Sequence, residues 1–571
     1  MTRTEVWPTP EDRWPTPEDR LPGPRREIPP SEPVGMYFEP AQLHYTGPET
    51  TGQLIALNYL HNVAAIQKAR PLSLIKRLRA RLPWPLYLVL VLQAALSIRL
   101  VWANTAFQDE ALYLWAGHME WAHWLDGTQI PDFATYFSGA PVVYPPVGAM
   151  ADSIGGLAAA RILSLAFMLA ATCLLWGMTG RLYGGRAGYF AAAMFAGLAA
   201  SQYLGAFATY DAMALFLLAL AAWLTVRASG RWSEPLIIVA ALVMALADAS
   251  KYAAALWDPI IVALAMLTAE HGGFLRRCLR GVRMVLYAGL IVALALRIGG
   301  HPYVTGILST TVSRAAGTSS VIGVLTVSAG WVGAVAFLAV LGAMVIFFDY
   351  RDWPARLTGV VLTLAIILAP ADQAHIRTII SLFKHVGFGA WFAAAVAGYA
   401  LASLVEAVPP GKAIQALRVG AGAAVAAGFV GALLATSHYH TWPNAKPFTA
   451  ALQPILKEST GPVVASEDTY ILQYYLRESS AEHVFANPGY FSYTDPNTHK
   501  RLHGNVAYAD AVKSRYFGII ALPFWAEPGT DIAMEKSIAR YGGYRLVRYI
   551  PYHMGNVVSA YHIWVRGGQS R

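Results

Sequence analysis

Eleven long apolar segments between residues 84 and 436 constrain this chain more than any other feature of its sequence. A helix needs about 20 predominantly apolar residues to cross a bilayer, and most of these segments come close to that length. A bilayer solvates such surface while helices pair their own backbone groups. The sequence therefore predicts an all-α polytopic membrane domain of about 11 helices. The segments lie near 84–102, 158–180, 187–204, 208–227, 235–250, 253–270, 282–298, 323–348, 357–371, 378–402 and 414–436.

The composition agrees with a membrane protein and argues against nucleic-acid binding. Of the 571 residues, 56% are hydrophobic and only 13% charged, whereas soluble domains carry about 25% charged residues. The formal charge of +9 comes from short loops between apolar segments, and no groove-reading motif accompanies it. Cys173 lies in an apolar segment and Cys278 in a basic loop, so no disulfide framework is expected.

The loop charges predict how the chain is threaded. Basic loops alternate with loops of lower positive charge, as the positive-inside rule requires. This alternation places the N-terminus in the cytoplasm and the C-terminus outside a plasma (inner) membrane. The loops expected inside are 181–186, 227–232, 271–283, 349–356 and 406–412.

The sequence divides into four parts. Residues 1–50 repeat the heptapeptide WPTPEDR and predict a disordered cytoplasmic tail; the purpose of the repeat stays open. Residues 51–81 predict an amphipathic helix with a basic end, which either binds anionic headgroups or only fixes topology. The membrane domain covers 82–437. Residues 438–571 predict a small extracytoplasmic α/β domain.

The α/β domain is expected from alternating short apolar and helical patterns. Strands are predicted at 461–466 and 516–522, with two more in RLVRYIPY and SAYHIWVR, and helices at 469–477 and 530–540. No nucleotide-binding glycine fingerprint occurs there. Three roles are compatible with such a domain: it acts as a lid, it binds the acceptor, or it only stabilises the protein.

The first outer loop, 103–157, holds the main concentration of candidate chemistry. Residues 106–127 predict an interfacial helix, with Leu112, Leu114 and three tryptophans supplying its apolar side. Asp109 and Glu110 stand where the chain leaves the membrane, where partial desolvation favours a general base. Since neighbouring helix residues point about 100° apart, only one is expected to contact a reacting hydroxyl.

Two further features border this loop. Tyr144 and Pro145 begin a rigid turn that forms one wall of a predicted cavity, although a Tyr-Pro-Pro sequence alone is a weak signal. Asp211 starts the fourth segment at the same outer end. It either pairs with Lys251, contacts a substrate or caps its helix.

Cations at the outer ends of the segments predict a phosphate pocket. Positive charge outside opposes the topology bias, and charge within a membrane is costly. A pocket for a lipid phosphate or pyrophosphate explains it; the alternative is that a lysine such as Lys384 snorkels to the headgroups. The candidates are Lys251, Arg314, Arg377, Lys384 and His385.

The residues from 105 to 255 resemble the GT-C membrane glycosyltransferases. The acidic pair and the Tyr-Pro-Pro turn are followed by Ala-Arg-Ile-Leu-Ser, by Gly-Arg-Leu-Tyr-Gly-Gly-Arg-Ala-Gly and by Thr-Tyr-Asp-Ala. The most similar branch is the dolichyl-phosphate-mannose protein mannosyltransferase group, with the lipid A aminoarabinose transferase and the Rgt-type lipopolysaccharide glycosyltransferases. From 255 to 436 only the topology is similar.

The resemblance implies a sugar donor on a polyprenyl phosphate and transfer of a hexosyl or pentosyl group, with inversion, to an acceptor at the outer face. Asp109 matches the catalytic base and Glu110 its companion, while Lys251 matches the lysine on the lipid phosphate. Lys384 and His385 precede Val-Gly-Phe-Gly where relatives carry a Tyr-rich run. The substrate cavity is predicted to include Tyr113, Tyr144, Pro145, Asp211 and Tyr252. Some relatives use a divalent metal, and no ligand spacing decides this point here.

The sequence thus predicts a glycosyltransferase that modifies a cell-envelope glycan, glycolipid or protein, such as lipopolysaccharide. The alternatives are a transporter or flippase for an envelope lipid, and a non-catalytic scaffold. A transporter more often shows repeated spans and broken helices at mid-membrane. The sugar, the acceptor and the oligomeric state stay open.

Overall fold

The computed structural model describes residues 84–228, 233–269, 273–311, 313, 316–465, 468–480, 484–486 and 491–568. The predicted tail at 1–50, the predicted basic helix at 51–81 and Arg314 lie outside the described residues. The chain forms two units, Met1–Arg79 and Ala80–Arg571, and every element described below belongs to the second.

The predicted polytopic helical domain is confirmed. Among the described residues, nine helical segments are long and apolar enough to span a bilayer. They are α3 (Trp84–Val101), α5 (Tyr144–Tyr183), α8 (Tyr210–Arg227), α9 (Ser233–Ser250), α11 (Phe274–Gly299), α13 (Val321–Asp349), α14 (Trp353–Leu364) continuing through η5 (Ala365–Ile367) into α15 (Leu368–His375), α16 (Leu382–Glu406) and α17 (Ala413–His438).

The other two predicted segments are helical but interrupted. The segment at 187–204 divides at Leu198, whose extended backbone separates α6 (Gly185–Gly197) from α7 (Ala199–Leu204). The segment at 253–270 begins as the 3-10 turn η4 (Tyr252–Trp257) and continues as the short helix α10 (Asp258–Leu267). Neither supplies the continuous helical length that a full span requires.

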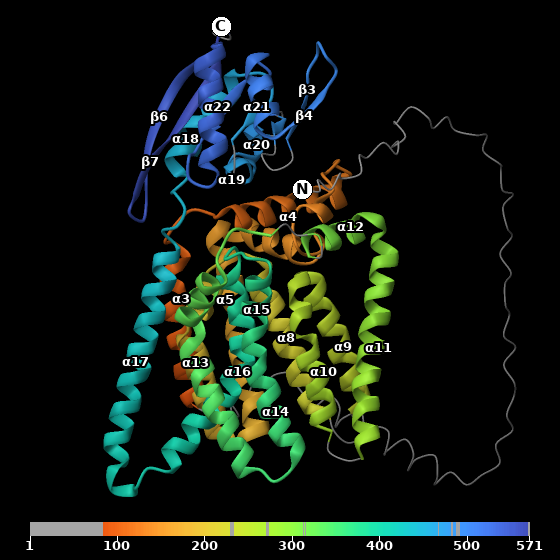
Figure 1. The fold of residues 1–571 in the computed structure, drawn as a ribbon, viewed down its shortest axis with the longest axis vertical. Helices are drawn as coiled ribbons and strands as arrows, with labels where there is room; N and C mark the ends of the chain where they lie inside the picture. The colour runs from red at the N-terminus through yellow and green to blue at the C-terminus, as the bar shows by residue number, and fades with distance from the viewer. Residues whose placement is uncertain are drawn as a thin grey trace, which may run out of the picture. The chain divides into compact units, whose positions relative to one another are not determined.

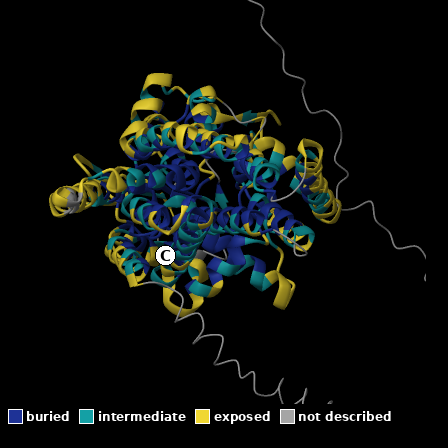
Figure 2. Ribbon diagram, turned by 90° about the horizontal axis from the view of Figure 1, so that it is seen from below, coloured by how far each residue is buried: buried dark blue, intermediate teal, exposed yellow. Residues whose placement is uncertain are grey.

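Helix α16 lies at the centre of the membrane domain. In the apolar stretch of α16 that could span the membrane, 72% of the residues are buried, against 11% in the corresponding stretch of α17. Small residues allow this close packing: a Cβ on Gly398 would lie 2.5 Å from the carbonyl oxygen of Ala187 on α6. Buried residues gather in the middle of the bundle and exposed ones lie on its periphery, as expected for a lipid-facing surface (Figure 2).

One end of the helical bundle is covered by α4 (Gln108–Asp126), which crosses it (Figure 1). The first half of α5 packs beneath α4, and Gly155 and Gly156 break α5 before it enters the membrane. The 3-10 turn η2 (Phe133–Thr135) and α12 (His301–Thr310) contact each other beside it.

The prediction that α4 lies in the interface with its apolar side against lipid is wrong for most of its length. Leu112, Leu114 and Trp115 are at most 9% exposed because α5 and α19 (Thr469–Tyr475) pack against them. Only its end offers apolar surface, with Trp124 46% and Leu125 74% exposed. The sequence pattern correctly predicted that α4 has an apolar side, but protein rather than lipid covers that side.

The predicted C-terminal α/β domain is confirmed. Its five-stranded sheet has the order β2-β1-β5-β7-β6, with β1 parallel to β2 and β5, and β7 antiparallel to β5 and β6. Helix α18 covers one side through Phe448, which stacks on Tyr561, and α21 and α22 cover the other. The bounds are α18 (Lys446–Glu458), β1 (Val463–Val464), α20 (Arg477–Ser480), β2 (Phe485–Ala486), β3 (Ser492–Thr494), β4 (Arg501–His503), α21 (Gly504–Lys513), β5 (Ile519–Leu522), α22 (Pro528–Tyr541), β6 (Tyr544–Met554) and β7 (Val557–Arg566).

Candidate active site

Four charged side chains from distant parts of the chain form a line of alternating sign. Lys384 Nζ, on the first turn of α16, lies 2.6 Å from Asp109 Oδ2 at the start of α4. The same ammonium lies 3.9 Å from Asp211 Oδ2 on α8. Asp211 Oδ1 in turn lies 2.7 Å from Lys251 Nζ, which follows α9. The structure therefore brings together the predicted base and two of the predicted cations.

Burial increases along this line from Asp109 inward. The side chain of Asp109 is 28% exposed, those of Lys384 and Lys251 are 7% and 3% exposed, and that of Asp211 is fully buried. Charges this deep persist only when they are paired, and the line pairs two acids with two lysines. Asp109 is the member that a ligand reaches first.

Aromatic rings border the lysines. Lys251 Nζ lies 4.6 Å from the centre of the Tyr210 ring, and Tyr210 stacks on Tyr113 at 4.4 Å. Lys384 Nζ lies 5.8 Å from the Phe207 ring. Burial and then the charge of Asp109 raise the pKa of the Tyr113 hydroxyl, which keeps it protonated. Tyr113, predicted as a cavity residue, thus lies at this site.

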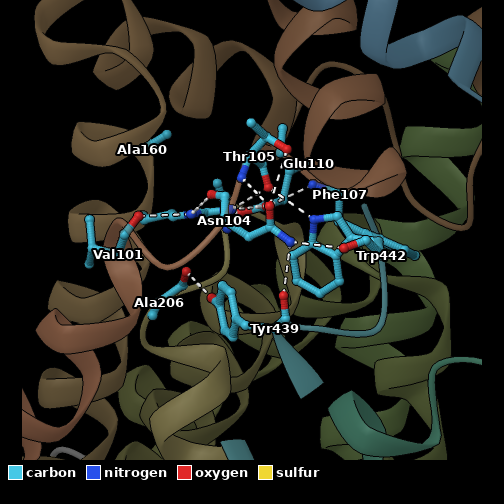
Figure 3. A network of polar contacts seen from close by, with 12 residues as sticks. Val101, Asn104, Thr105, Phe107, Glu110, Ala160, Ala206, Tyr439 and Trp442 are labelled. Carbon is cyan, nitrogen blue, oxygen red and sulfur yellow. Dashed lines mark hydrogen bonds and ion pairs between the residues drawn. The ribbon is translucent and has the colours of Figure 1, made fainter. Parts of the chain in front are cut away.

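Glu110 does not join the line of charges. It is fully buried, and Arg161 binds both its oxygens, Nε to Oε1 at 2.8 Å and Nη2 to Oε2 at 2.6 Å (Figure 3). Its carboxylate also accepts hydrogen bonds from the backbone N–H groups of Ala208 and Phe107. With its oxygens engaged in this way, Glu110 anchors the start of α4.

Arg161 is the central residue of this anchor, and the sequence reasoning did not single it out. Besides Glu110, it donates to the carbonyl oxygens of Val101, Asn104 and Thr105 at 2.8, 2.9 and 3.2 Å. These bonds fix the path from α3 to α4 and so hold Asp109 in place. The available signal was an arginine inside an apolar segment, which is costly unless it is paired.

Of the other predicted cations, the structure describes Arg377 and His385, and His385 lies close enough to Asp211 for their charges to interact. His385 is buried beside Gln373, with their side-chain nitrogens 3.4 Å apart. Arg377 is exposed and has a left-handed backbone with φ of 51°, and it forms no ion pair with any described residue. Asp211 begins α8 and accepts a hydrogen bond from Thr209 in addition to pairing with Lys251.

The Tyr-Pro-Pro sequence, predicted as a rigid turn, is instead the first turn of α5, where proline is compatible with a helix, and it supports α4. Tyr144 and Pro145 are buried, and a Cβ on Gly117 of α4 would lie 1.9 Å from the carbonyl oxygen of Pro145. Trp121 of α4 donates to the Pro146 carbonyl at 2.9 Å. The turn is thus a packing surface for the helix that carries Asp109. Tyr252 is half-buried and lies next to Lys251, where its backbone N–H donates to Ser138 at 3.1 Å.

A second polar cluster ties the C-terminal domain to this region. Asp152, on the first half of α5, accepts a hydrogen bond from the Tyr474 hydroxyl of α19 at 2.5 Å, and His118 Nε2 of α4 lies 2.6 Å from its other oxygen. Arg477 Nη1 lies 3.6 Å from that oxygen. Burial and the charge of Asp152 raise the pKa of Tyr474. Asp152 therefore connects α5 to α4, α19 and α20.

The described residues include no group of three or more His, Cys, Asp or Glu side chains placed to hold a metal ion. The line of charges holds two carboxylates beside two ammonium groups, and two ammonium groups are poor neighbours for a divalent cation. Metal dependence stays open.

The helical bundle, the outer helix and the α/β domain define a polytopic membrane protein with the GT-C glycosyltransferase fold. Within that class, residues 152–298 match the family described as dolichyl-phosphate-mannose-protein mannosyltransferase. The resemblance inferred from the sequence is confirmed. No curated protein gives a significant sequence match.

Solved structures with this fold are similar over most of the chain. The crystal structure of ArnT from Cupriavidus metallidurans bound to undecaprenyl phosphate has a TM-score of 0.55 and 13% identity, covering 85% of this chain and 98% of that one. The crystal structure of the same protein in the apo state has a TM-score of 0.54 and 15% identity, covering 83% of this chain and 97% of that one. The Archaeoglobus fulgidus oligosaccharyltransferase tethered to an acceptor peptide gives 0.51 and 14%, covering 83% of this chain and 73% of that one.

Proposed function

We propose that this protein transfers a sugar from a polyprenyl phosphate to a hydroxyl-bearing cell-envelope acceptor, with Asp109 as general base. The observation that carries the proposal is the line Asp109–Lys384–Asp211–Lys251, in which an accessible carboxylate precedes two buried ammonium groups. An attacking hydroxyl needs a base, and a departing phosphate needs cations where its charge accumulates. Both groups lie in one site.

The pairing of Asp109 with Lys384 suggests how the two halves work together. The donor phosphodiester carries one negative charge, as a carboxylate does, and the departing phosphate monoester carries more, so Lys384 is drawn from Asp109 to the phosphate as the bond breaks. As Lys384 turns to the phosphate, Asp109 loses its cation and accepts a hydrogen bond from the acceptor. Lys251, already paired with Asp211, supplies the second positive charge.

The reaction then balances as a single displacement. The acceptor oxygen attacks the anomeric carbon and gives its proton to Asp109. The bond from that carbon to the phosphate oxygen breaks, and the electron pair leaves on the lipid phosphate, where Lys384 and Lys251 stabilise it. One displacement inverts the anomeric configuration. The products are the glycosylated acceptor and the polyprenyl phosphate.

The likenesses in fold support the choice of substrates. ArnT, which shares the fold, has been solved with undecaprenyl phosphate, and the oligosaccharyltransferase has been solved with an acceptor peptide. We infer a lipid-linked donor and a glycan, glycolipid or protein acceptor. The positive-inside pattern favours an outward-facing site, with the C-terminal domain outside the cell.

The test is transfer by the purified protein in nanodiscs from a panel of synthetic undecaprenyl-phosphate sugars. Mass spectrometry of envelope glycans from a deletion strain selects the sugar and the acceptor. Asp109→Asn should lower the rate by about 100-fold to 10,000-fold. Asp126→Asn, at the exposed end of the same helix, is the matched control and should keep full activity. Full activity of Asp109→Asn would remove Asp109 as the base.

Binding of undecaprenyl phosphate, followed by native mass spectrometry, tests the cations separately. Lys251→Ala should lose most of its affinity for this lipid. A Lys251→Ala protein that binds the lipid as tightly as the wild type would contradict the phosphate pocket, whatever the activity assay shows.

A further inference from the structure

The hairpin formed by β6 and β7 has an unusual composition for a surface element. Residues 544–566 include three arginines and two histidines but no aspartate or glutamate. Of its four tyrosines, Tyr552 and Tyr561 belong to the core of the domain, whereas Tyr549 is exposed. No acidic side chain of the hairpin would repel anionic headgroups.

The tip of the hairpin is exposed and apolar. Gly555 and Asn556 form its two-residue turn, with Gly555 in the left-handed region at φ of 56°. The next two residues, Val557 and Val558, are 50% and 68% exposed. Tyr549, further along β6, is 62% exposed. Adjacent exposed valines at a turn are a cost in water, where turns are normally polar.

Contacts place this tip where the chain leaves the membrane. A Cβ on Gly555 would lie 3.7 Å from the carbonyl oxygen of His440, two residues after the end of α17. The same stretch is bound to the end of α3, because the Asn104 side chain donates to the carbonyls of Tyr439 and Trp442 at 2.9 and 3.0 Å. Trp102, at the end of α3, is 67% exposed, as an interfacial tryptophan is.

We propose that the β6–β7 hairpin tip inserts into the outer leaflet next to α17, with Val557 and Val558 below the headgroups. The free edge of β6, which carries Arg545, Arg548 and Pro551, is protected against pairing with another strand. The hairpin would thus be a lipid contact of the C-terminal domain, separate from its protein contacts through α19. This inference does not depend on the proposed reaction.

The experiment uses the full-length chain in nanodiscs, with Cys173 and Cys278 replaced by serine. An environment-sensitive fluorophore on Val558→Cys should show blue-shifted emission and quenching by doxyl-labelled lipids. The control is Val506→Cys on α21 of the same domain, 64% exposed, which should show neither. Unquenched emission at Val558, equal to that at Val506, would overturn the proposal.

A second measurement addresses the valines. A fluorophore on His553→Cys, an exposed position of β6 next to the tip, should also be quenched by the doxyl-labelled lipids. Val557→Asp/Val558→Asp should abolish this quenching. Equal quenching with and without the two aspartates would overturn the role of the valines in insertion.

Discussion

Asp109 and Lys384 lie 275 residues apart in the sequence, and their side chains meet at 2.6 Å. This contact joins helix α4 to the central membrane helix α16. In the proposed reaction Lys384 has two roles, because the ammonium that pairs with the proposed base is also the one that would receive the leaving phosphate. The charge on Lys384 is therefore the most informative one to change.

Lys384→Met should abolish transfer, with a loss of about 100-fold or more, because the leaving phosphate loses its nearest cation. Lys384→Arg should keep part of the activity, since it preserves the charge but changes the geometry. Turnover in nanodiscs gives the rate, and thermal unfolding separates it from misfolding. Near wild-type turnover of a folded Lys384→Met protein would show that the phosphate is held elsewhere.

The pair Asp211–Lys251 should behave as a buried ion pair. Lys251→Met alone should lower the free energy of unfolding by about 3–5 kcal/mol, because it leaves Asp211 with only the more distant Lys384, at 3.9 Å. Adding Asp211→Asn should restore a large part of that loss, since the double variant removes both charges of this pair. A thermodynamic cycle on the two single variants and the double variant measures the coupling. Simple additivity would contradict a direct interaction.

Arg161→Met should destabilise the outer loop by about 3–5 kcal/mol, because Glu110 is then buried without its partner. Hydrogen exchange should accelerate at residues 101–110, where Arg161 binds three backbone carbonyls. Arg99→Met, in an arginine whose side chain is less buried, is the comparison and should leave that segment unchanged. Unaltered exchange in Arg161→Met would show that α4 is held by packing alone.

Tyr474→Phe should loosen the C-terminal domain, because it removes the hydrogen bond to the buried Asp152. The expected loss is about 1–3 kcal/mol in the stability of that contact, seen as faster proteolysis after Tyr439. Tyr549→Phe, on an exposed tyrosine of the same domain, is the control. Equal cleavage of both variants would exclude a role of Asp152 in holding the domain.

Much of the membrane domain was predictable because a bilayer leaves few alternatives for long apolar segments. The same physics singled out Lys251 and Lys384, since unpaired charge at that depth is costly. Their partners were harder to predict, because whether Asp211 caps a helix or pairs with Lys251 depends on where α9 ends relative to α8. Asp211 pairs with Lys251, while Thr209 occupies the N-cap of α8 and no side-chain cap hydrogen bond forms there.

Glu110 and Arg161 show what the sequence did not reveal. Their bond links residues 51 positions apart, and nothing in the local pattern around Glu110 says which of two adjacent acids faces inward. The burial of α4 was misjudged for a similar reason. An apolar helix side is the same in sequence whether lipid or another part of the protein covers it, and here α19 covers it.

The break at Gly155 and Gly156 gives α5 two directions. Gly156 has φ of 65° and ψ of −163°, a conformation open essentially to glycine alone. Before the break, Asp152 holds the C-terminal domain through Tyr474; after it, Arg161 holds Glu110 beside Asp109. The angle at these two glycines thus sets the distance between the C-terminal domain and Asp109.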